Sequence, residues 1–126
     1  MRELLIVGQC DFDSQRISFV LSKIYDIEFH RADSFDDAIQ KSLDQQFDLI
    51  MINRLMDLDR SEGMAILHEL KSNPQTENTP AMIISDYQDA QEAAVAAGAS
   101  PGFRKARLDT PQTFELLSNF LQAEGI

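Results

Sequence analysis

The hydrophobic positions of this 126-residue chain fall into short runs separated by longer amphipathic segments. Three uninterrupted apolar runs, at residues 4–7, 49–52 and 81–84, have the length and composition of strands covered on both faces of a parallel sheet. Two weaker segments, at residues 26–30 and 102–105, fit as a second and a fifth strand. Strands that alternate with helix-length segments predict a parallel sheet with helices on both faces, because right-handed crossovers distribute the helices in that way.

Local signals mark where the intervening helices begin and end. Asp11 can cap a first helix, and Ser34, followed by an acidic residue one turn later, can cap a second. Gly98 has the place of a C-terminal glycine cap after an alanine-rich helix, and Pro111 fits the first turn of the last helix. The pattern predicts one doubly wound α/β domain with strand order 2-1-3-4-5.

Composition narrows the classes of function. The 11 Lys and Arg against 21 Asp and Glu give a formal charge of −10, which repels phosphate backbones and anionic lipid surfaces. We therefore expect no nucleic-acid partner and no membrane partner. The chain enters its first strand-like run directly after Met1, which leaves no room for a signal peptide, and the single cysteine, Cys10, agrees with a reducing compartment. Together these features predict a cytoplasmic protein.

Read in order, several segments resemble the receiver domain of two-component response regulators, and the resemblance spans residues 3–123. The matching landmarks are the first strand at 4–7, the second strand-helix junction at 32–38, the third strand at 47–53, Glu62-Gly63 at the third helix, residues 79–85 ending in Ser85, and Ala97-Gly98-Ala99 followed by Lys105. The resemblance implies a CheY-like, flavodoxin-like (βα)5 domain over residues 1–126, with a five-stranded parallel sheet.

The residues at the expected phosphorylation site depart from the family pattern. Receivers use two acids after the first strand and one at the end of the third to hold Mg²⁺ and accept a phosphoryl group. Here Gly8 and Gln9 replace the acidic pair, and Asn53 replaces the acceptor aspartate. A carboxamide is neither a carboxylate nucleophile nor an anionic ligand for a hard cation. The resemblance therefore implies a pseudo-receiver that is not an enzyme and has no metal and no cofactor.

Ser85 and Lys105 match the residues with which receivers grip the phosphoryl oxygens. Without the usual anions of the pocket, the Lys105 ammonium needs another partner, because a buried unpaired charge is costly. Three outcomes stay open: a hydrogen bond to the carboxamide oxygens of Asn53 and Gln9, an ion pair with a nearby acid, or an outward turn into solvent. The acids considered are Asp11, Asp57 and Asp86.

Two positions compete for the aromatic side chain that moves with the receiver switch. Family spacing places it at Gly102, which has no side chain, and a slip of one residue places it at Phe103. The sequence leaves both alternatives open.

The loop between Asn53 and Gly63 is longer than the family pattern and rich in acidic residues. Residual phosphotransfer onto Asp57 or Asp59 would require this loop to fold back into the site, since geometry precedes chemistry. A longer loop over a site without its acids could instead form a recognition surface.

The leading hypothesis is a phosphorylation-independent signalling module that acts by binding a protein partner. The resemblance places partner contacts on the face made by the fourth helix, the fifth strand and the fifth helix, and homodimerisation through this face is a further hypothesis. The candidate contact residues are Tyr87, Gln91, Phe103, Arg104 and Arg107.

An alternative hypothesis is a ligand-gated sensor. In it Gln9, Asn53, Ser85 and Lys105 bind a small anion or metabolite at the carboxyl edge of the sheet. The sensor predicts an open polar pocket at this edge, whereas the interaction module predicts a pocket closed by side chains.

Overall fold

Four strands form one parallel sheet in the computed structural model, which describes residues 1–122. Their order across the sheet is β2-β1-β3-β4. Val7 pairs with Ala32 on one side and with Ile52 on the other, so the carboxyl ends of three strands lie at the same edge. The bounds are β1 (Arg2–Val7), β2 (Ile27–Ala32), β3 (Leu49–Asn53) and β4 (Ala81–Ile84).

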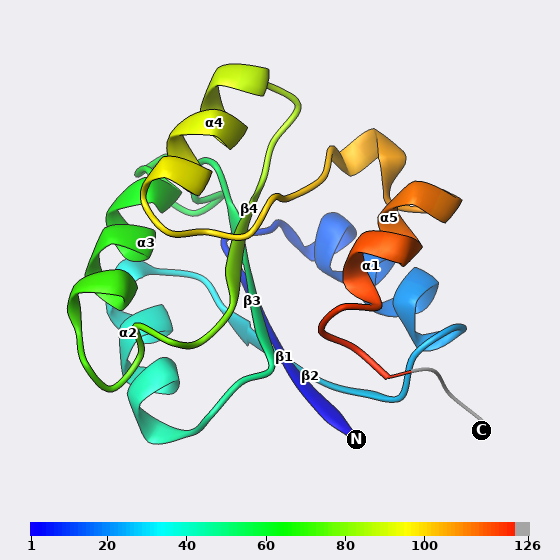
Figure 1. Ribbon diagram of the computed structural model, residues 1–126, viewed down its shortest axis with the longest axis horizontal. Helices are drawn as coiled ribbons and strands as arrows, with labels where there is room; N and C mark the ends of the chain where they lie inside the picture. The colour runs from blue at the N-terminus through cyan, green and yellow to red at the C-terminus, as the bar shows by residue number, and fades with distance from the viewer. Residues whose placement is uncertain (123–126) are drawn as a thin grey trace.

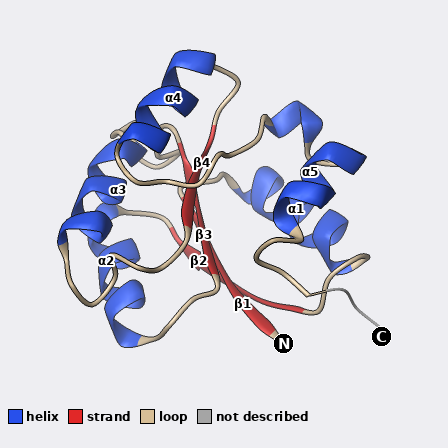
Figure 2. Cartoon of the chain, in the orientation of Figure 1, coloured by secondary structure: helices blue, strands red, loops and turns tan. Residues whose placement is uncertain are grey.

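The helices cover both faces of this sheet (Figures 1 and 2). In Figure 1, α2, α3 and α4 lie on one side of the strands, and α1 and α5 lie on the other. This arrangement is the flavodoxin-like, doubly wound fold that the sequence predicts. The bounds are α1 (Asp11–Ser22), α2 (Phe35–Asp44), α3 (Gly63–Ser72), α4 (Gln88–Ala96), the 3₁₀-helix η1 (Lys105–Arg107) and α5 (Pro111–Leu117).

Alternate residues of β1, β3 and β4 point into two separate cores. In β1, Leu5 and Val7 pack on the side of α2, α3 and α4, whereas Leu4 and Ile6 pack on the side of α1 and α5. All four side chains are at most 2% exposed. Burying each such side chain stabilises the fold by about 1.5–3 kcal/mol, which explains why the strands read as continuous apolar runs.

Most of the predicted helix boundaries are confirmed. The Ser34 hydroxyl accepts a hydrogen bond from the Asp37 backbone at 3.1 Å, and Gly98 follows α4 with a φ of +106°. The prediction for α1 is wrong by one residue, because Cys10 is its N-cap and the Cys10 thiol accepts from the Asp13 amide. Asp11 instead pairs with Arg31 at 2.8 Å.

The fifth strand predicted at residues 102–105 does not form a regular strand in the described part of the chain. Two backbone hydrogen bonds join this segment to β4 and its end, from Ser100 to Ala81 and from Ser85 to Phe103. Between them the Gln91 carboxamide replaces the backbone ladder, since its Nε2 donates to the carbonyl of Ile83 at 2.8 Å and its Oε1 accepts from Gly102 at 3.0 Å. Side-chain bridging thus substitutes for strand pairing at this edge.

Replacing Gln91 by leucine is expected to lower the free energy of unfolding by about 1–3 kcal/mol, because two backbone groups lose their partners. Urea unfolding followed by circular dichroism measures this change. Gln88→Leu, on the exposed start of the same helix, is the matched control and should change stability by less than about 0.5 kcal/mol. Equal unfolding midpoints for the two variants would contradict the bridging role.

Candidate functional site

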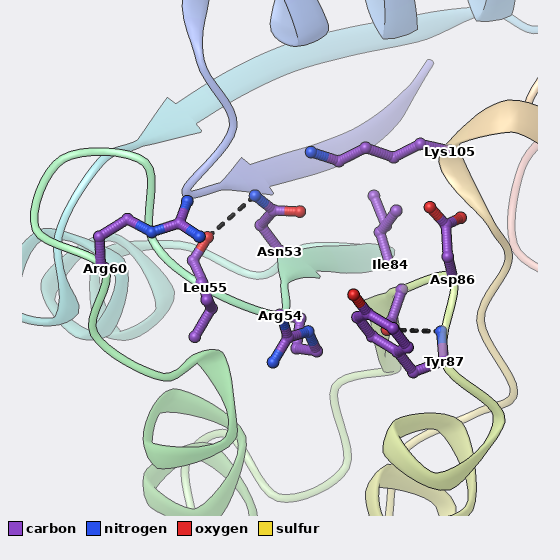
Figure 3. A pocket seen from close by; sticks show the side chains of 9 residues that line it. Asn53, Arg54, Leu55, Arg60, Ile84, Asp86, Tyr87 and Lys105 are labelled. Carbon is purple, nitrogen blue, oxygen red and sulfur yellow. Dashed lines mark hydrogen bonds between the residues drawn. The ribbon is translucent and has the colours of Figure 1, made fainter.

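Three of the predicted site residues meet in one pocket at the carboxyl edge of the sheet. Asn53 ends β3, Ser85 follows β4, and Lys105 begins η1. They line a hollow of about 160 Å³, shown in Figure 3. The other lining residues are Arg54, Leu55, Arg60, Ile84, Asp86 and Tyr87.

The two remaining predicted residues, Gly8 and Gln9, line a different hollow of about 260 Å³. It lies between the end of β1 and the end of β2, and Asp57 of the long loop contributes to its wall. The sequence analysis treated these five residues as one pocket, whereas in the structure they line two separate hollows.

Met56 lies against the end of β1, where the resemblance places the acidic pair. Its side chain is fully buried, and a Cβ atom on Gly8 would lie 2.5 Å from its terminal methyl carbon. The loop folds back to bring it there, since the amide of Asp57 donates to the Gly8 carbonyl at 2.9 Å. An apolar residue in a polar loop is the signal that could have identified this role, and the sequence analysis did not use it.

The Asn53 side chain is held in one orientation. Its Nδ2 donates to the backbone carbonyls of Leu55 at 2.9 Å and Gly8 at 3.3 Å. The amide nitrogen therefore faces two carbonyl oxygens, and Figure 3 shows the Oδ1 atom turned the other way, on the side of the Lys105 ammonium.

Lys105 forms an ion pair with Asp13 of α1, with 2.8 Å between Nζ and Oδ2. None of the three acids named from the sequence is its partner, and no hydrogen bond joins it to Asn53 or Gln9 in the described residues. Asp13 lies in the first turn of α1, and the packing of this helix brings it close to Lys105, which the linear sequence does not reveal.

Gln9 is 2% exposed, and neither Nε2 nor Oε1 has a hydrogen-bond partner among the described residues. Ser85 is also buried, and its hydroxyl oxygen accepts from the amide of Tyr87 at 3.1 Å. The Tyr87 ring in turn lies under the Arg54 guanidinium, 4.8 Å from the ring centre. These contacts fix the wall of the pocket on the side of β4.

The predicted partner face keeps some of its residues and loses others. Tyr87 is 58% exposed, and Arg104 and Arg107 are exposed as well. Phe103 is 7% exposed and packs in the core with α1 and α5, so the prediction of a surface contact is wrong for this residue. The Gln91 carboxamide is bound to the backbone.

The structure also shows where the two positions considered for the switch aromatic lie. Gly102 lies beside α4, and a Cβ atom there would be 1.9 Å from the carbonyl oxygen of Ile83. Phe103 points into the opposite core. Neither residue presents an aromatic side chain to α4.

The loop acids Asp57 and Asp59 do not reach Asn53. Asp57 lines the hollow at Gly8, and Asp59 accepts from the hydroxyl of Ser61 at 2.6 Å and from its amide at 2.9 Å. These bonds, the hydroxyl first, lower the pKa of Asp59 below its ordinary value. The geometry gives no support to residual phosphotransfer onto either acid.

Away from the pocket, the Glu3 carboxylate bonds to His30 Nε2 at 2.7 Å and to the Gln45 amide at 3.1 Å. These bonds, the one to His30 first, hold the pKa of Glu3 below its ordinary value of 4.5. A lowered folded-state pKa contributes stability that is present above the unfolded pKa and is lost as pH falls through the folded one.

Glu3→Gln is therefore expected to flatten the fall in stability below pH 4.5, and to cost less than about 1 kcal/mol at neutral pH because the pair is partly exposed. Urea unfolding at a series of acidic pH values measures the slope. Glu28→Gln, an exposed position on β2, is the control and should leave the slope unchanged. Parallel curves for wild type and Glu3→Gln would contradict the assignment.

No protein-family model and no curated protein matches the sequence. Solved structures do resemble the chain. The chemotaxis protein CheY4 of Vibrio cholerae superposes with a TM-score of 0.76 at 20% identity, over 96% of this chain and 99% of that one. The Mn²⁺-bound response regulator Rcp1 gives a TM-score of 0.70 at 19% identity, over 92% and 95% of the two chains.

A signal receiver domain of a histidine kinase from Syntrophus aciditrophicus gives a TM-score of 0.66 at 21% identity, over 100% of this chain and 97% of that one. These likenesses show that the chain has the flavodoxin-like α/β fold of these receiver domains. In this chain Asn53 stands at the end of β3, and Gly8 and Gln9 follow β1.

Two searches of the described residues bear on the site. No three His, Cys, Asp or Glu side chains within residues 1–122 gather closely enough to hold a metal ion. In the same part of the chain, no helix has the length and apolar character needed to cross a bilayer.

Proposed function

We propose that this chain is a receiver-like signalling module that acts through protein contacts and independently of phosphorylation. The observation that carries the proposal is the environment of Asn53, whose Nδ2 is bonded to two backbone carbonyls beside the buried Met56. An acceptor aspartate would need anionic oxygens and a hydrated cation in this place.

The electrostatics of the edge argue against Mg²⁺ at this site. Magnesium requires oxygen ligands, among them carboxylates, in an octahedral shell that keeps several waters. Gly8 supplies only a backbone carbonyl, and that carbonyl already accepts from Asp57 and Asn53. The Met56 side chain fills the adjacent space.

The proposed partner surface is the exposed part of the face around α4, η1 and α5. Tyr87, Arg104 and Arg107 are its accessible members. Aromatic and arginine side chains are the residue types that most often dominate the energy of protein interfaces. Analytical ultracentrifugation of the purified chain distinguishes a partner that is a second copy of this chain from one that is another signalling protein.

Asn53→Asp tests the proposal. The new carboxylate would face the carbonyl oxygens of Leu55 and Gly8 where an N–H group now donates, so the free energy of unfolding is expected to fall by about 1–3 kcal/mol. The variant should also fail to bind beryllofluoride, a mimic of an acyl phosphate, in the presence of Mg²⁺. Amide NMR titration and urea unfolding measure the two effects.

Asn78→Asp, an exposed position in the loop before β4, makes the same chemical change away from the site and should leave stability within about 0.5 kcal/mol of wild type. Saturable, Mg²⁺-dependent shifts of amide resonances on adding beryllofluoride, in Asn53→Asp or in the wild-type protein, would contradict the proposal of phosphorylation independence.

A further inference from the structure

We propose that a hollow at the amino edge of the sheet binds a small neutral polyhydroxyl compound, such as a single sugar ring. The strands are parallel, so the starts of β3 and β4 lie at the edge opposite to Asn53 and Ser85. The proposal goes beyond the function proposed above, since partner binding does not require it. The hollow has about 250 Å³ and is lined by Ser42 and Leu43 of α2, Gln45 and Gln46 before β3, and Gln75 and Thr79 before β4.

The lining of this hollow is uncharged. None of the described residues that line it has an ionisable side chain, although 25% of the residues of the chain are charged. An ionic ligand would lose part of its hydration here without gaining a counter-charge, which is costly. The formal charge of −10 on the chain repels anions in addition. The hollow therefore favours a ligand without charge.

The Thr79 hydroxyl is the polar group that most directly indicates a ligand. Thr79 is 6% exposed, and its carbonyl accepts from the Lys71 ammonium at 2.9 Å, but its hydroxyl forms no hydrogen bond with the described residues. Within residues 1–122, the enclosed side-chain atoms without a partner belong to Gln9 and Ser14 alone, so the Thr79 hydroxyl is not enclosed. It is free to donate to and to accept from a ligand in the hollow that Thr79 lines.

The other polar groups supply a mixture of acceptors and donors. The Ser42 hydroxyl donates to a carbonyl of its own helix at 2.7 Å, and the Gln45 Nε2 donates to Glu3 at 3.1 Å, so the oxygens of both side chains remain as acceptors. Gln46 and Gln75 are exposed, and their carboxamides form no hydrogen bond within residues 1–122. Because each hydroxyl group both donates and accepts, a ligand with several adjacent hydroxyls matches this set.

The wall formed by the segment between α3 and β4 is held in place before any ligand binds. Thr76 is 2% exposed, and its hydroxyl donates to the Leu70 carbonyl at 2.7 Å. The Asn73 Oδ1 accepts from the backbone amide of Gln75 at 2.9 Å. These bonds fix the backbone on which Gln75 and Thr79 stand, so binding a ligand there requires little further ordering.

The size of the hollow and its one apolar residue fit a sugar ring. Leu43 is 39% exposed and offers an apolar surface to the C–H groups of a ring whose hydroxyls face the polar side chains. Sites for drug-sized ligands and cofactors usually span about 300–1,000 Å³, and this hollow has about 250 Å³. It is suited to one ring or one short polyol.

The test is an NMR titration of the full chain at constant ionic strength, with glucose, sorbitol and gluconate as separate probes. We expect saturable shifts of the side-chain NH₂ groups of Gln46 and Gln75 and of the Thr79 amide. The midpoint should be on the order of 1–10 mM, because neutral hydrogen bonds are individually weak. Gluconate differs from sorbitol by a terminal carboxylate and should bind at least about threefold more weakly. The tighter of glucose and sorbitol identifies the ligand as a ring or an open chain.

Two pairs of variants place the ligand in this hollow. Thr79→Val should weaken binding by about fivefold or more without lowering stability, because the lost hydroxyl has no partner among the described residues. Thr79→Ser keeps the hydroxyl and should bind within about twofold of wild type. Gln46→Ala should weaken binding by about threefold or more, whereas Gln15→Ala, at an exposed position on α1, should stay within about twofold.

The proposal is overturned if neither glucose nor sorbitol gives saturable shifts at these residues up to about 100 mM, or if gluconate binds as tightly as sorbitol. These two outcomes need no variant, so a folding defect cannot obscure them. Wild-type affinity in a folded Thr79→Val variant, or shifts centred on Asn53 and Ser85 instead, would also overturn it. Failure here leaves the outcome of the Asn53→Asp experiment unaffected.

Discussion

Replacing Met56 by alanine is expected to lower the free energy of unfolding by about 2–5 kcal/mol. The Met56 side chain is fully buried: it packs against Gly8 and belongs to the core beside α3. Truncation would leave a cavity at the end of β1, and the fixed strands around it limit how far the structure can collapse.

Urea unfolding measures the effect, and two variants serve as controls. Met56→Leu conserves the volume and should cost less than about 1.5 kcal/mol. Leu58→Ala, in the same loop but 71% exposed, should cost less than about 0.5 kcal/mol. A loss at Met56→Ala no greater than the loss at Leu58→Ala would mean that the loop does not seal this edge of the sheet.

Gly63→Ala is expected to destabilise the fold by about 3 kcal/mol. Glycine at the start of a helix is ordinarily improved by alanine, by about 0.5–1 kcal/mol, because the unfolded glycine has more conformational freedom. Here a Cβ atom would lie 2.1 Å from the Asn53 carbonyl oxygen and 2.8 Å from the Ile52 side chain. This steric contact with the backbone outweighs the helix preference of alanine, so the substitution destabilises the protein instead of stabilising it.

Thermal and urea unfolding of Gly63→Ala measure this cost. His68→Ala, on the exposed face of the same helix, introduces alanine without a clash and should stay within about 0.5 kcal/mol of wild type. The clash also pushes on the backbone of Asn53, so its amide resonance should shift. A stabilised Gly63→Ala variant would show that α3 does not approach β3 as closely as the structure has it.

The fold could be predicted from the sequence because its signals are local. A strand such as residues 49–52 is apolar on both faces because helices cover both faces of the sheet. Ser34 and Gly98 mark helix ends through contacts within one turn of the helix. The prediction of a fifth regular strand is wrong because the competing partner, Gln91, lies on a helix and meets the segment only after packing.

The candidate site was predicted only in part. Asn53, Ser85 and Lys105 do meet in one hollow, since parallel strands bring their carboxyl ends to the same edge. The position of Met56 and the approach of Arg54 and Arg60 to this hollow depend on how the loop at residues 54–62 folds back onto the sheet edge. No sequence periodicity encodes the path of such a loop.

The sequence by itself determined the element order, the two-sided burial of the strands and the absence of carboxylates at Gly8, Gln9 and Asn53. These properties follow from residue type and local spacing. The tertiary structure alone decided that Lys105 pairs with Asp13 and that Phe103 is buried. Both depend on distances between segments far apart in the chain, which packing sets.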